Sequence, residues 1–165
     1  MNKFSTGYIF LKCMPVIFKN EGGYVWDKDD PGGETNMGIC RMFYPDLDIR
    51  NLTKEQATDI YFNDYWLKMN IAGIHDENLV LQIFDMGINA GIRTAIKIIQ
   101  RFVHVEVDGR IGPVTIKAIN DSQDRLVMLY KEERKKYYSD LVRRKPTMQK
   151  FLKGWIKRVD TTKFS

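Results

Sequence analysis

The chain has 165 residues, enough for one domain that buries a hydrophobic core without disulfides or metal ions. Its apolar content of 44% and charged content of 28% are ordinary for a globular protein and exclude a largely disordered chain. The net charge of +5 suits a polyanionic partner such as nucleic acid, anionic lipid or the bacterial cell wall, but it fits a solvated basic face equally well.

Residues 6–20 are predicted to form the first helix, because apolar side chains recur there at helical spacing. Pro15 lies inside this segment and is expected to kink the helix or to start a second turn. The apolar run at residues 8–18 contains Lys12, has no cleavage site of small residues, and is too short to span a bilayer. The pattern therefore predicts a core helix, with neither a signal peptide nor stable membrane insertion.

The next segment, residues 21–38, is rich in glycine and contains a proline, which is typical of turns. Short extended pieces are expected at residues 24–26 and 36–39. We therefore predict a small hairpin or an irregular loop after the first helix.

The remainder of the chain is predicted to be helical. Thr53 and Gln56 form a capping-box pattern at the start of a helix that reaches about Met69. Another helix is expected to begin after Asp76 and to stop at Gly91. Further helices are expected at residues 94–103, after Pro113, at residues 123–144 and after Pro146. The predicted fold class is mainly α, with one domain over residues 1–165.

Metal and disulfide chemistry have little support in the sequence. Cys13 and Cys40 are too few for a disulfide framework, and they do not form a C-x-x-C pair. His75 and His104 are the only imidazoles, so the composition disfavours a zinc site. We expect buried thiols, no metal site and no organic cofactor.

The residue types that can carry chemistry are concentrated after the first helix. Glu21 ends an apolar helix beside a glycine-rich turn, and burial against apolar side chains raises the pKa of a carboxylic acid. A glycosidase needs such a protonated acid for the leaving oxygen. Asp30 follows nine residues later, and Thr35 and Asn36 come soon after, so these groups could position or activate water. The alternative is that Glu21 is a surface residue and Asp30 part of an ordinary turn.

The ordered motifs resemble those of glycoside hydrolase family 108, the N-acetylmuramidases of bacteria and phages. They are EGGY at residues 21–24, DPGGETNMGI at 30–39, FDMGINAG at 84–91, VDGRIGPVT at 107–115, and FLKGW with Arg158 at 151–158. The resemblance covers nearly the whole chain. It implies a lysozyme-like helical domain with a catalytic half at residues 1–91 and a helical half resembling a peptidoglycan-binding region at 92–165.

In that family the glutamate of the EGGY motif is the catalytic acid, so the resemblance assigns this role to Glu21. The order Glu21, Asp30, Thr35 is also similar to the Glu/Asp/Thr arrangement of phage T4-type lysozymes, although the last gap differs by one residue. Thr35 and Asn36 thus compete for the water-positioning role. The chain has Asn20 where the family often has histidine, and Met37 where it often has an aromatic residue, which puts contacts to sugar in doubt.

Several other residues have both a binding and a structural interpretation. Tyr24 is predicted to contact substrate, since aromatic faces stack on sugar rings, and Trp26 is left open. Asn36 and Asn89 are candidate substrate contacts, although Asn89 could instead tie two helices together. Asp85 shares a helix face with Asn89 and is assigned a structural role. The DG motif at residues 108–109 is explained by turn chemistry.

These observations favour an enzyme that cleaves the bond between N-acetylmuramic acid and N-acetylglucosamine in peptidoglycan. The setting would be phage lysis or protein secretion, with synthesis in the cytoplasm and action in the periplasm or cell wall after release. One alternative is a non-catalytic wall-binding accessory protein of the same fold. A nucleic-acid binder is disfavoured by the scattered charge. The motifs do not specify an oligomeric state.

Overall fold

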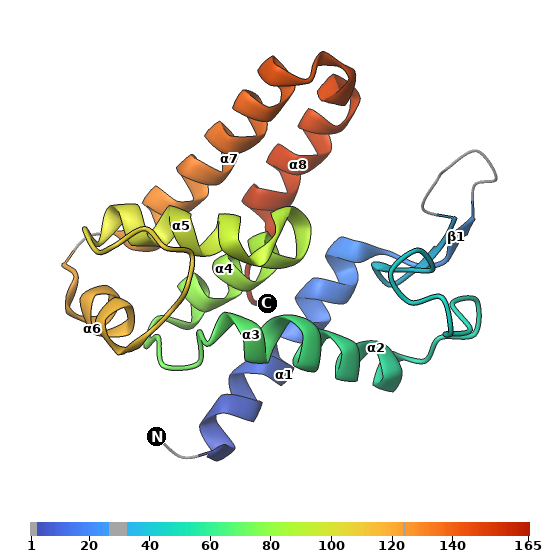
Figure 1. Ribbon diagram of the computed structural model, residues 1–165, viewed down its shortest axis with the longest axis horizontal. Helices are drawn as coiled ribbons and strands as arrows, with labels where there is room; N and C mark the ends of the chain where they lie inside the picture. Colours follow the sequence, from blue (N-terminus) through green and yellow to red (C-terminus); the bar gives the residue numbers. More distant parts are fainter. Residues whose placement is uncertain (1–2, 27–32, 124) are drawn as a thin grey trace.

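The computed structural model describes residues 3–26, 33–123 and 125–165, and the chain in these ranges is mainly helical, as predicted (Figure 1). The elements in chain order are α1 (Lys3–Glu21), β1 (Val25–Trp26), β2 (Glu34–Asn36), β3 (Ile39–Cys40), α2 (Lys54–Tyr61), a π-helical stretch (Phe62–Trp66), α3 (Leu67–Met69), α4 (Glu77–Ala90), α5 (Ile92–Phe102), α6 (Pro113–Asp121), α7 (Leu126–Arg144), a 3-10 turn (Pro146–Met148) and α8 (Gln149–Thr161). None of the described helices is long and apolar enough to cross a membrane.

The first helix continues through Pro15 as one element, α1, where the sequence predicted a kink or a new turn. Pro15 has no N–H to donate, so the carbonyl of Leu11 loses its helical partner. Both residues lie on the exposed side of α1, where water can serve that carbonyl. The opposite side of α1 buries Cys13, Met14 and Ile17 in the core.

The glycine-rich segment forms a three-stranded antiparallel sheet in the order β1-β2-β3. The predicted extended piece at residues 36–39 is extended only at its ends, Asn36 in β2 and Ile39 in β3, because Met37 and Gly38 between them have positive φ (48° and 78°) and form a tight turn. A turn with positive φ at both central residues has a backbone twist that matches the twist of the antiparallel strands it joins. We call residues 22–26 and 33–52 the β lobe, and the described helices α1–α8 the helical body.

The predicted ends of the middle helices are confirmed. The side chain of Thr53 accepts a hydrogen bond from the backbone N–H of Gln56, whose side chain accepts one from the backbone N–H of Thr53. Asp76 caps α4, which stops at Gly91 with φ +95°. The segment from α2 to α3 reaches Met69 as expected, but it contains a π-helical stretch that the sequence pattern did not indicate.

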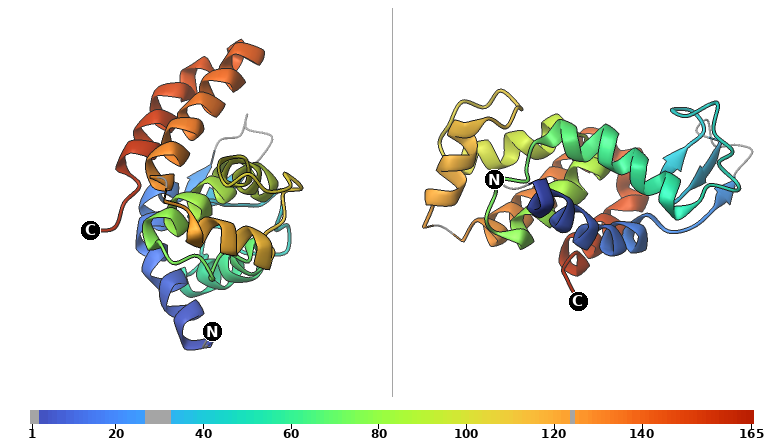
Figure 2. Two further views of the ribbon diagram at one scale, coloured as in Figure 1. Left: turned by 90° about the vertical axis from the view of Figure 1, so that its left-hand side faces the viewer. Right: turned by 90° about the horizontal axis from the view of Figure 1, so that it is seen from below.

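Helix α4 lies at the centre of the molecule, where α5, α7 and part of α1 pack around it (Figures 1 and 2). Every residue from Leu79 to Gly87 is buried, including Gln82 and Asp85. A helix that is buried on all sides is usually apolar throughout. The two buried polar residues of α4 therefore need partners inside the protein, and these partners lie at the candidate site.

The loop between α5 and α6 is organised by one buried side chain, that of Gln100. Its amide nitrogen donates to the Asp108 carboxylate and to the Arg110 carbonyl, and its oxygen accepts from the backbone N–H of Gly109. These bonds explain the DG motif as a structural turn, as predicted. Helix α6 begins shortly after this turn, at Pro113.

Helices α7 and α8 lie side by side as a hairpin that projects from the rest of the body (Figures 1 and 2). Trp155 of α8 stacks on Tyr138 of α7, with ring centroids 5.0 Å apart. The base of the hairpin packs on α4, and there α8 brings Arg158 toward the end of α1. The hairpin thus delivers a cation from the end of the chain to Glu21.

Candidate active site

Glu21 is the last residue of α1 and stands where the helical body meets the β lobe. Its side chain is 15% exposed, so it is largely enclosed but still reachable from solvent. The positive φ of Gly22 (76°) turns the backbone away from the helix directly after Glu21. The end of α1 therefore presents a carboxylate at the seam between the two regions.

One oxygen of this carboxylate is held by Arg158. Nη2 of Arg158 lies 2.5 Å from Oε1 of Glu21 and 2.8 Å from Oδ1 of Asp85. Nε of Arg158 also donates to both oxygens of Asp85 at 3.1 Å. Since the guanidinium is planar and rigid, its two-sided pairing with Asp85 fixes the direction in which it meets Glu21.

Asp85 is fully buried on α4 and pairs with a second arginine, Arg134 of α7, at 2.5 Å. Burial disfavours the ionised carboxylate, but Arg134 and Arg158 outweigh that effect, and the pKa of Asp85 is lowered. The two carboxylates keep the pKa of Arg158 above its usual value, despite the opposing effect of burial. Asp85 therefore has the structural role predicted for it.

Amide and hydroxyl groups complete this charged cluster. Asn20 donates to Asp85 at 2.8 Å and to the Thr162 hydroxyl at 2.9 Å. Gln82 accepts from Arg134 and donates to the Thr162 carbonyl. Asn20, which stands where the resembling family often has histidine, thus links α1 to α4 and to the residue after α8.

The other side of the Glu21 carboxylate faces the turn between β2 and β3. A Cβ atom added to Gly38 would lie 2.6 Å from Oε2 of Glu21 and 2.3 Å from the hydroxyl oxygen of Tyr61. That hydroxyl donates to the Met37 carbonyl at 2.8 Å. Burial and the nearby charge of Glu21 raise the pKa of Tyr61 well above its usual value. Tyr61 is therefore a neutral donor that holds the turn against the acid.

The two residues that competed for the water-positioning role point to opposite faces of the sheet, because they are neighbours on β2. Asn36 is buried, and its amide donates to the carbonyls of Ile49 (3.0 Å) and Arg50 (3.4 Å). It therefore ties β2 to the loop before α2. Thr35 is half-buried in the central strand, opposite Val25 and Cys40. Asp30 lies outside the described residues.

Tyr24 and Trp26 are both exposed on the β lobe, by 37% and 53%. The Tyr24 hydroxyl donates to Glu34 at 2.9 Å, and the guanidinium of Arg50 stands 5.5 Å from the centre of its ring. Hydrogen bonds from Arg41 and then from Tyr24 lower the pKa of Glu34. Tyr24 is thus fixed in place by its polar end, and its predicted contact with substrate stays a prediction.

Asn89 is partly buried near the end of α4, and its side-chain oxygen accepts a hydrogen bond of 2.5 Å from the Tyr138 hydroxyl. This bond joins α4 to α7, which was the structural alternative for Asn89. The proposed contact with an N-acetyl group stays a prediction, and it would have to use the amide nitrogen.

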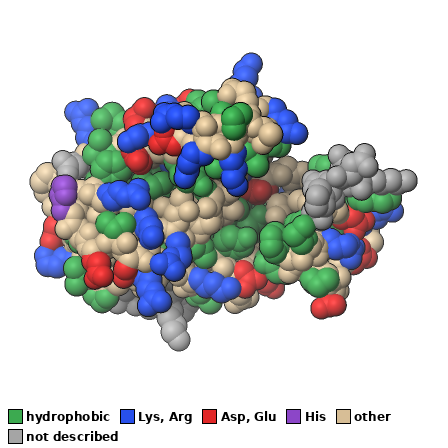
Figure 3. All heavy atoms as spheres, turned by 45° about the horizontal axis from the view of Figure 1, so that its top comes forward, with side chains coloured by type: hydrophobic (Ala, Val, Ile, Leu, Met, Phe, Trp, Pro, Cys, Tyr) green, Lys and Arg blue, Asp and Glu red, His purple; other side chains and the backbone are tan. Residues whose placement is uncertain are grey.

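A hollow opens between the α7–α8 hairpin and the β lobe (Figure 3). Hydrophobic side chains lie along its floor, and basic side chains of the hairpin border it. Such a surface suits a long, uncharged or anionic chain better than a small enclosed ligand. In the described part of the chain, no group of three His, Cys, Asp or Glu side chains is placed to hold a metal ion.

Sequence reasoning missed the groups that orient Glu21. Arg158 was noticed as part of a closing motif, but no role followed from it, because its partner is 137 residues away. Arg134 sits in the strongly charged helix α7, a composition typical of a solvated face, yet its side chain is fully buried. A charged residue at an apolar helical position was the available signal, since the side chains of Tyr130, Arg134 and Tyr138 share one face of α7.

Comparisons with known proteins show the family of this chain. A family model described as "Glycosyl hydrolase 108" matches residues 14–91, and one described as "Predicted Peptidoglycan domain" matches residues 94–160. Among solved structures, SagA from Brucella abortus is similar to this chain, with 33% sequence identity and a TM-score of 0.78. The match covers 94% of this chain and 92% of the SagA chain. A search of curated protein sequences found no match.

The region matched by the first model contains Glu21, Asp85 and Asn89, and the region matched by the second contains Arg134 and Arg158. The charged cluster is therefore assembled from both matched regions. The identity to SagA extends over nearly the full length of both chains, so the likeness is not confined to either region. This chain belongs to the glycosyl hydrolase 108 family of peptidoglycan glycosidases.

Proposed function

We propose that the protein is an N-acetylmuramidase that hydrolyses the bond between N-acetylmuramic acid and N-acetylglucosamine, with Glu21 as the general acid. One observation carries the proposal: Glu21 is a largely enclosed but reachable carboxylate, oriented by Arg158 where α1 meets the β lobe, in a chain of a glycosidase family. A pure binding protein has no need of a carboxylate held in this way.

The two oxygens of Glu21 suit different tasks. Arg158 donates to Oε1, which leaves Oε2 as the oxygen that can carry the acidic proton. Glycoside hydrolysis delivers one proton to the leaving oxygen and removes one from the attacking water. Oε2 of Glu21 would supply the first proton. This chemistry needs no metal ion or organic cofactor.

For the water we propose Thr35, with Asp30 as the second carboxylate. The Asn36 amide is engaged inside the lobe, whereas Thr35 lies on the opposite face of β2. A hydroxyl can both accept from and donate to a water molecule. Asp30, between β1 and β2 in the chain, would accept the proton that the water loses.

We further propose that the protein acts on the cell wall in the periplasm, in phage lysis or in a secretion step, after synthesis in the cytoplasm. The net charge of +5 and the basic side chains along the hollow support attraction to an anionic wall. Tyr24 and Trp26, exposed on the β lobe, offer aromatic surface for sugar rings.

The test compares the wild type with Glu21→Gln on purified peptidoglycan, following turbidity and the chemical identity of the new reducing ends. We expect muramic-acid ends from the wild type and a rate lower by about a hundredfold to ten-thousandfold for the variant, because general acid catalysis is lost. Glu55→Gln, an exposed change in the first turn of α2, is the matched control.

Three other results would contradict the proposal. N-acetylglucosamine reducing ends would show a different bond specificity. A fully active Glu21→Gln variant would remove Glu21 from the acid role. Binding to the wall without cleavage by the wild type would support the non-catalytic accessory protein instead.

A further inference from the structure

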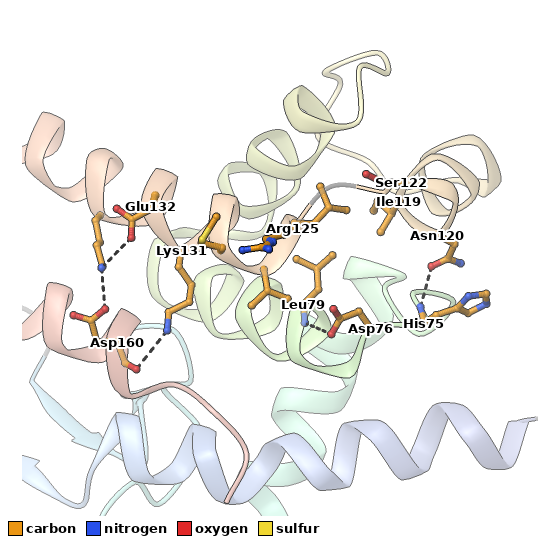
Figure 4. Close-up of a pocket in the computed structure, with 14 residues that line it drawn as sticks. His75, Asp76, Leu79, Ile119, Asn120, Ser122, Arg125, Lys131, Glu132 and Asp160 are labelled. Atoms are coloured by element: carbon orange, nitrogen blue, oxygen red, sulfur yellow. Dashed lines mark hydrogen bonds and ion pairs between the residues drawn. The ribbon is translucent and has the colours of Figure 1, made fainter.

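A second concavity lies away from Glu21, between the start of α4, the end of α6, the first half of α7 and the end of α8 (Figure 4). Its volume is about 600 Å³, and neither Glu21 nor Arg158 lines it. Pockets that hold small molecules usually measure ~300–1,000 Å³. The concavity is therefore large enough for a ligand of a few residues.

The acidic side chains at this pocket are already engaged. The Asp76 carboxylate caps α4 by accepting hydrogen bonds from the backbone N–H groups of Asn78 and Leu79. Glu132 and Asp160 both pair with Lys135, at 3.1 and 2.9 Å (Figure 4). Each acidic group thus already has partners within the protein, and the single ammonium of Lys135 is shared by Glu132 and Asp160.

Two cations at the pocket are not matched in this way. The ammonium of Lys131 contacts the backbone carbonyl of Asp160 at 3.4 Å, and none of the described carboxylates forms an ion pair with it. The Arg125 side chain lies between Lys131 and Leu79 in the middle of the pocket (Figure 4). Within the described ranges no carboxylate pairs with its guanidinium. The pocket therefore offers two donors suited to the carboxylates of a ligand.

The floor of the pocket is aliphatic. Leu79, Ile119 and Leu126 are buried beneath it, and Val127 and Met128 lie at its side. Apart from His75, the described residues that line it include no aromatic ring. Sugar rings are bound mainly on aromatic faces, whereas small alkyl groups pack well on leucine and isoleucine. The lining therefore fits a short peptide with several carboxylates and small apolar side chains better than a glycan.

We propose that this pocket binds the peptide stem of peptidoglycan, with Arg125 and Lys131 on the stem carboxylates and its alanine methyl groups on the aliphatic floor. The inference rests on the proposed function in that it takes peptidoglycan as the substrate. Holding a stem away from the hollow gives the enzyme a second attachment to the same polymer. A second attachment raises the local concentration of glycan at Glu21 without any new contact there.

The test uses the full chain and a soluble stem tetrapeptide, L-alanyl-γ-D-glutamyl-meso-diaminopimelyl-D-alanine, titrated by calorimetry and by NMR. Arg125→Gln combined with Lys131→Gln should raise the Kd by about tenfold or more, because two charged hydrogen bonds are lost. Lys68→Gln with Lys117→Gln removes the same charge from exposed sites outside the pocket and should leave the Kd within about twofold. Thermal unfolding of each variant confirms that it is folded.

The rates of hydrolysis separate this inference from the proposed function. The pocket variant should cut intact peptidoglycan more slowly than the control variant, while both cut glycan strands stripped of peptides at the wild-type rate. Absence of stem binding by the wild type, or equal weakening in both double variants, would overturn the pocket and leave the muramidase proposal standing. Stem binding by a wild type that cuts no glycan would support the pocket and refute the muramidase.

Discussion

The helical body and the β lobe differ in how deeply their side chains are buried. In the body, α4 is buried at every residue from Leu79 to Gly87. In the described part of the lobe, both residues of β1 are exposed, and the buried side chains are those of Asn36, Ile39, Ile49 and Leu52. The body therefore supplies the rigid framework, and the lobe supplies surface.

Glu21 lies at the boundary and takes its support unequally from the two sides. The body holds its carboxylate with Arg158, itself fixed by Asp85 and indirectly by Arg134. The lobe contributes the turn between β2 and β3, where Gly38 comes close to the Glu21 carboxylate and the Met37 carbonyl accepts a hydrogen bond from Tyr61. A catalytic group that must keep one geometry is best anchored on packed helices.

The largest expected effect comes from breaking the anchor in the body. Asp85→Asn keeps the shape of the side chain but leaves Arg134 and Arg158 short of negative charge at a fully buried site. We expect the free energy of unfolding to fall by about 3–5 kcal/mol, measured by urea denaturation. Asp64→Asn, which breaks a surface pair with Lys68, should cost no more than about 1 kcal/mol. Equal losses would show that the buried cluster is not the anchor.

The same variant has a pH signature. The pKa of Asp85 is lowered in the folded protein, so its contribution to stability is fully present above the ordinary pKa of 3.8 and is lost as the pH falls below it. Asp85→Asn should therefore flatten the acid limb of the stability curve below about pH 4. An acid limb as steep as that of the wild type would assign the acid sensitivity to other carboxylates.

The next effect falls on catalysis rather than on stability. Arg158→Lys keeps the positive charge, but one ammonium cannot reproduce the planar contacts to both Glu21 and Asp85. We expect kcat on peptidoglycan to fall by about a hundredfold, because the acid is misplaced. The exposed neighbour Lys157, changed to Arg, serves as the control and should retain full activity. An active Arg158→Lys enzyme would mean that charge alone, without geometry, supports Glu21.

A smaller effect tests the side of Glu21 that faces the lobe. Gly38→Ala places a methyl group against the Tyr61 hydroxyl and the Glu21 carboxylate, at a backbone position with φ +78°. We expect a loss of about 1–3 kcal/mol in stability and about a tenfold loss of activity. Gly33→Ala carries the same kind of backbone strain at φ +68°, but no described atom lies within 4 Å of the added Cβ. Its activity should stay near that of the wild type, and a matching loss would attribute the effect of Gly38→Ala to backbone strain alone.

The sequence predicted the features that depend on nearby residues. Capping by Thr53 and Asp76 and the stop at Gly91 act within a few residues, so the ends of these helices were visible in the pattern. The extended piece predicted at residues 36–39 ran through the turn into Ile39, because a strand of two residues, such as β3, carries no alternation that marks its start. The π-helical stretch depends on tertiary packing, which no local pattern records.

In the candidate site, too, the local feature could be predicted and the long-range contacts could not. Glu21 could be chosen from its local context and from the resemblance, because the motif is continuous in the chain. Its orientation could not be predicted, since Arg158 and Gly38 reach it from other segments and Asp85 fixes Arg158 from a third. Asn36 and Thr35 could not be distinguished until the register of β2 placed them on opposite faces.

The smallest intervention uses the two cysteines to compare body and lobe directly, without replacing any residue. Cys13 is fully buried on α1, and burial raises the pKa of its thiol to about 12, whereas Cys40 in β3 is half-buried. At pH 8 the thiolate fraction of Cys13 is then about a thousandfold below that of an ordinary thiol with a pKa of 9.0. We expect iodoacetamide to label Cys40 first in the native protein and Cys13 only at the rate of unfolding, as measured by mass spectrometry of tryptic peptides. If the two cysteines react at equal rates in the native protein, α1 opens as readily as the lobe, and it could not be the rigid support from which Glu21 acts.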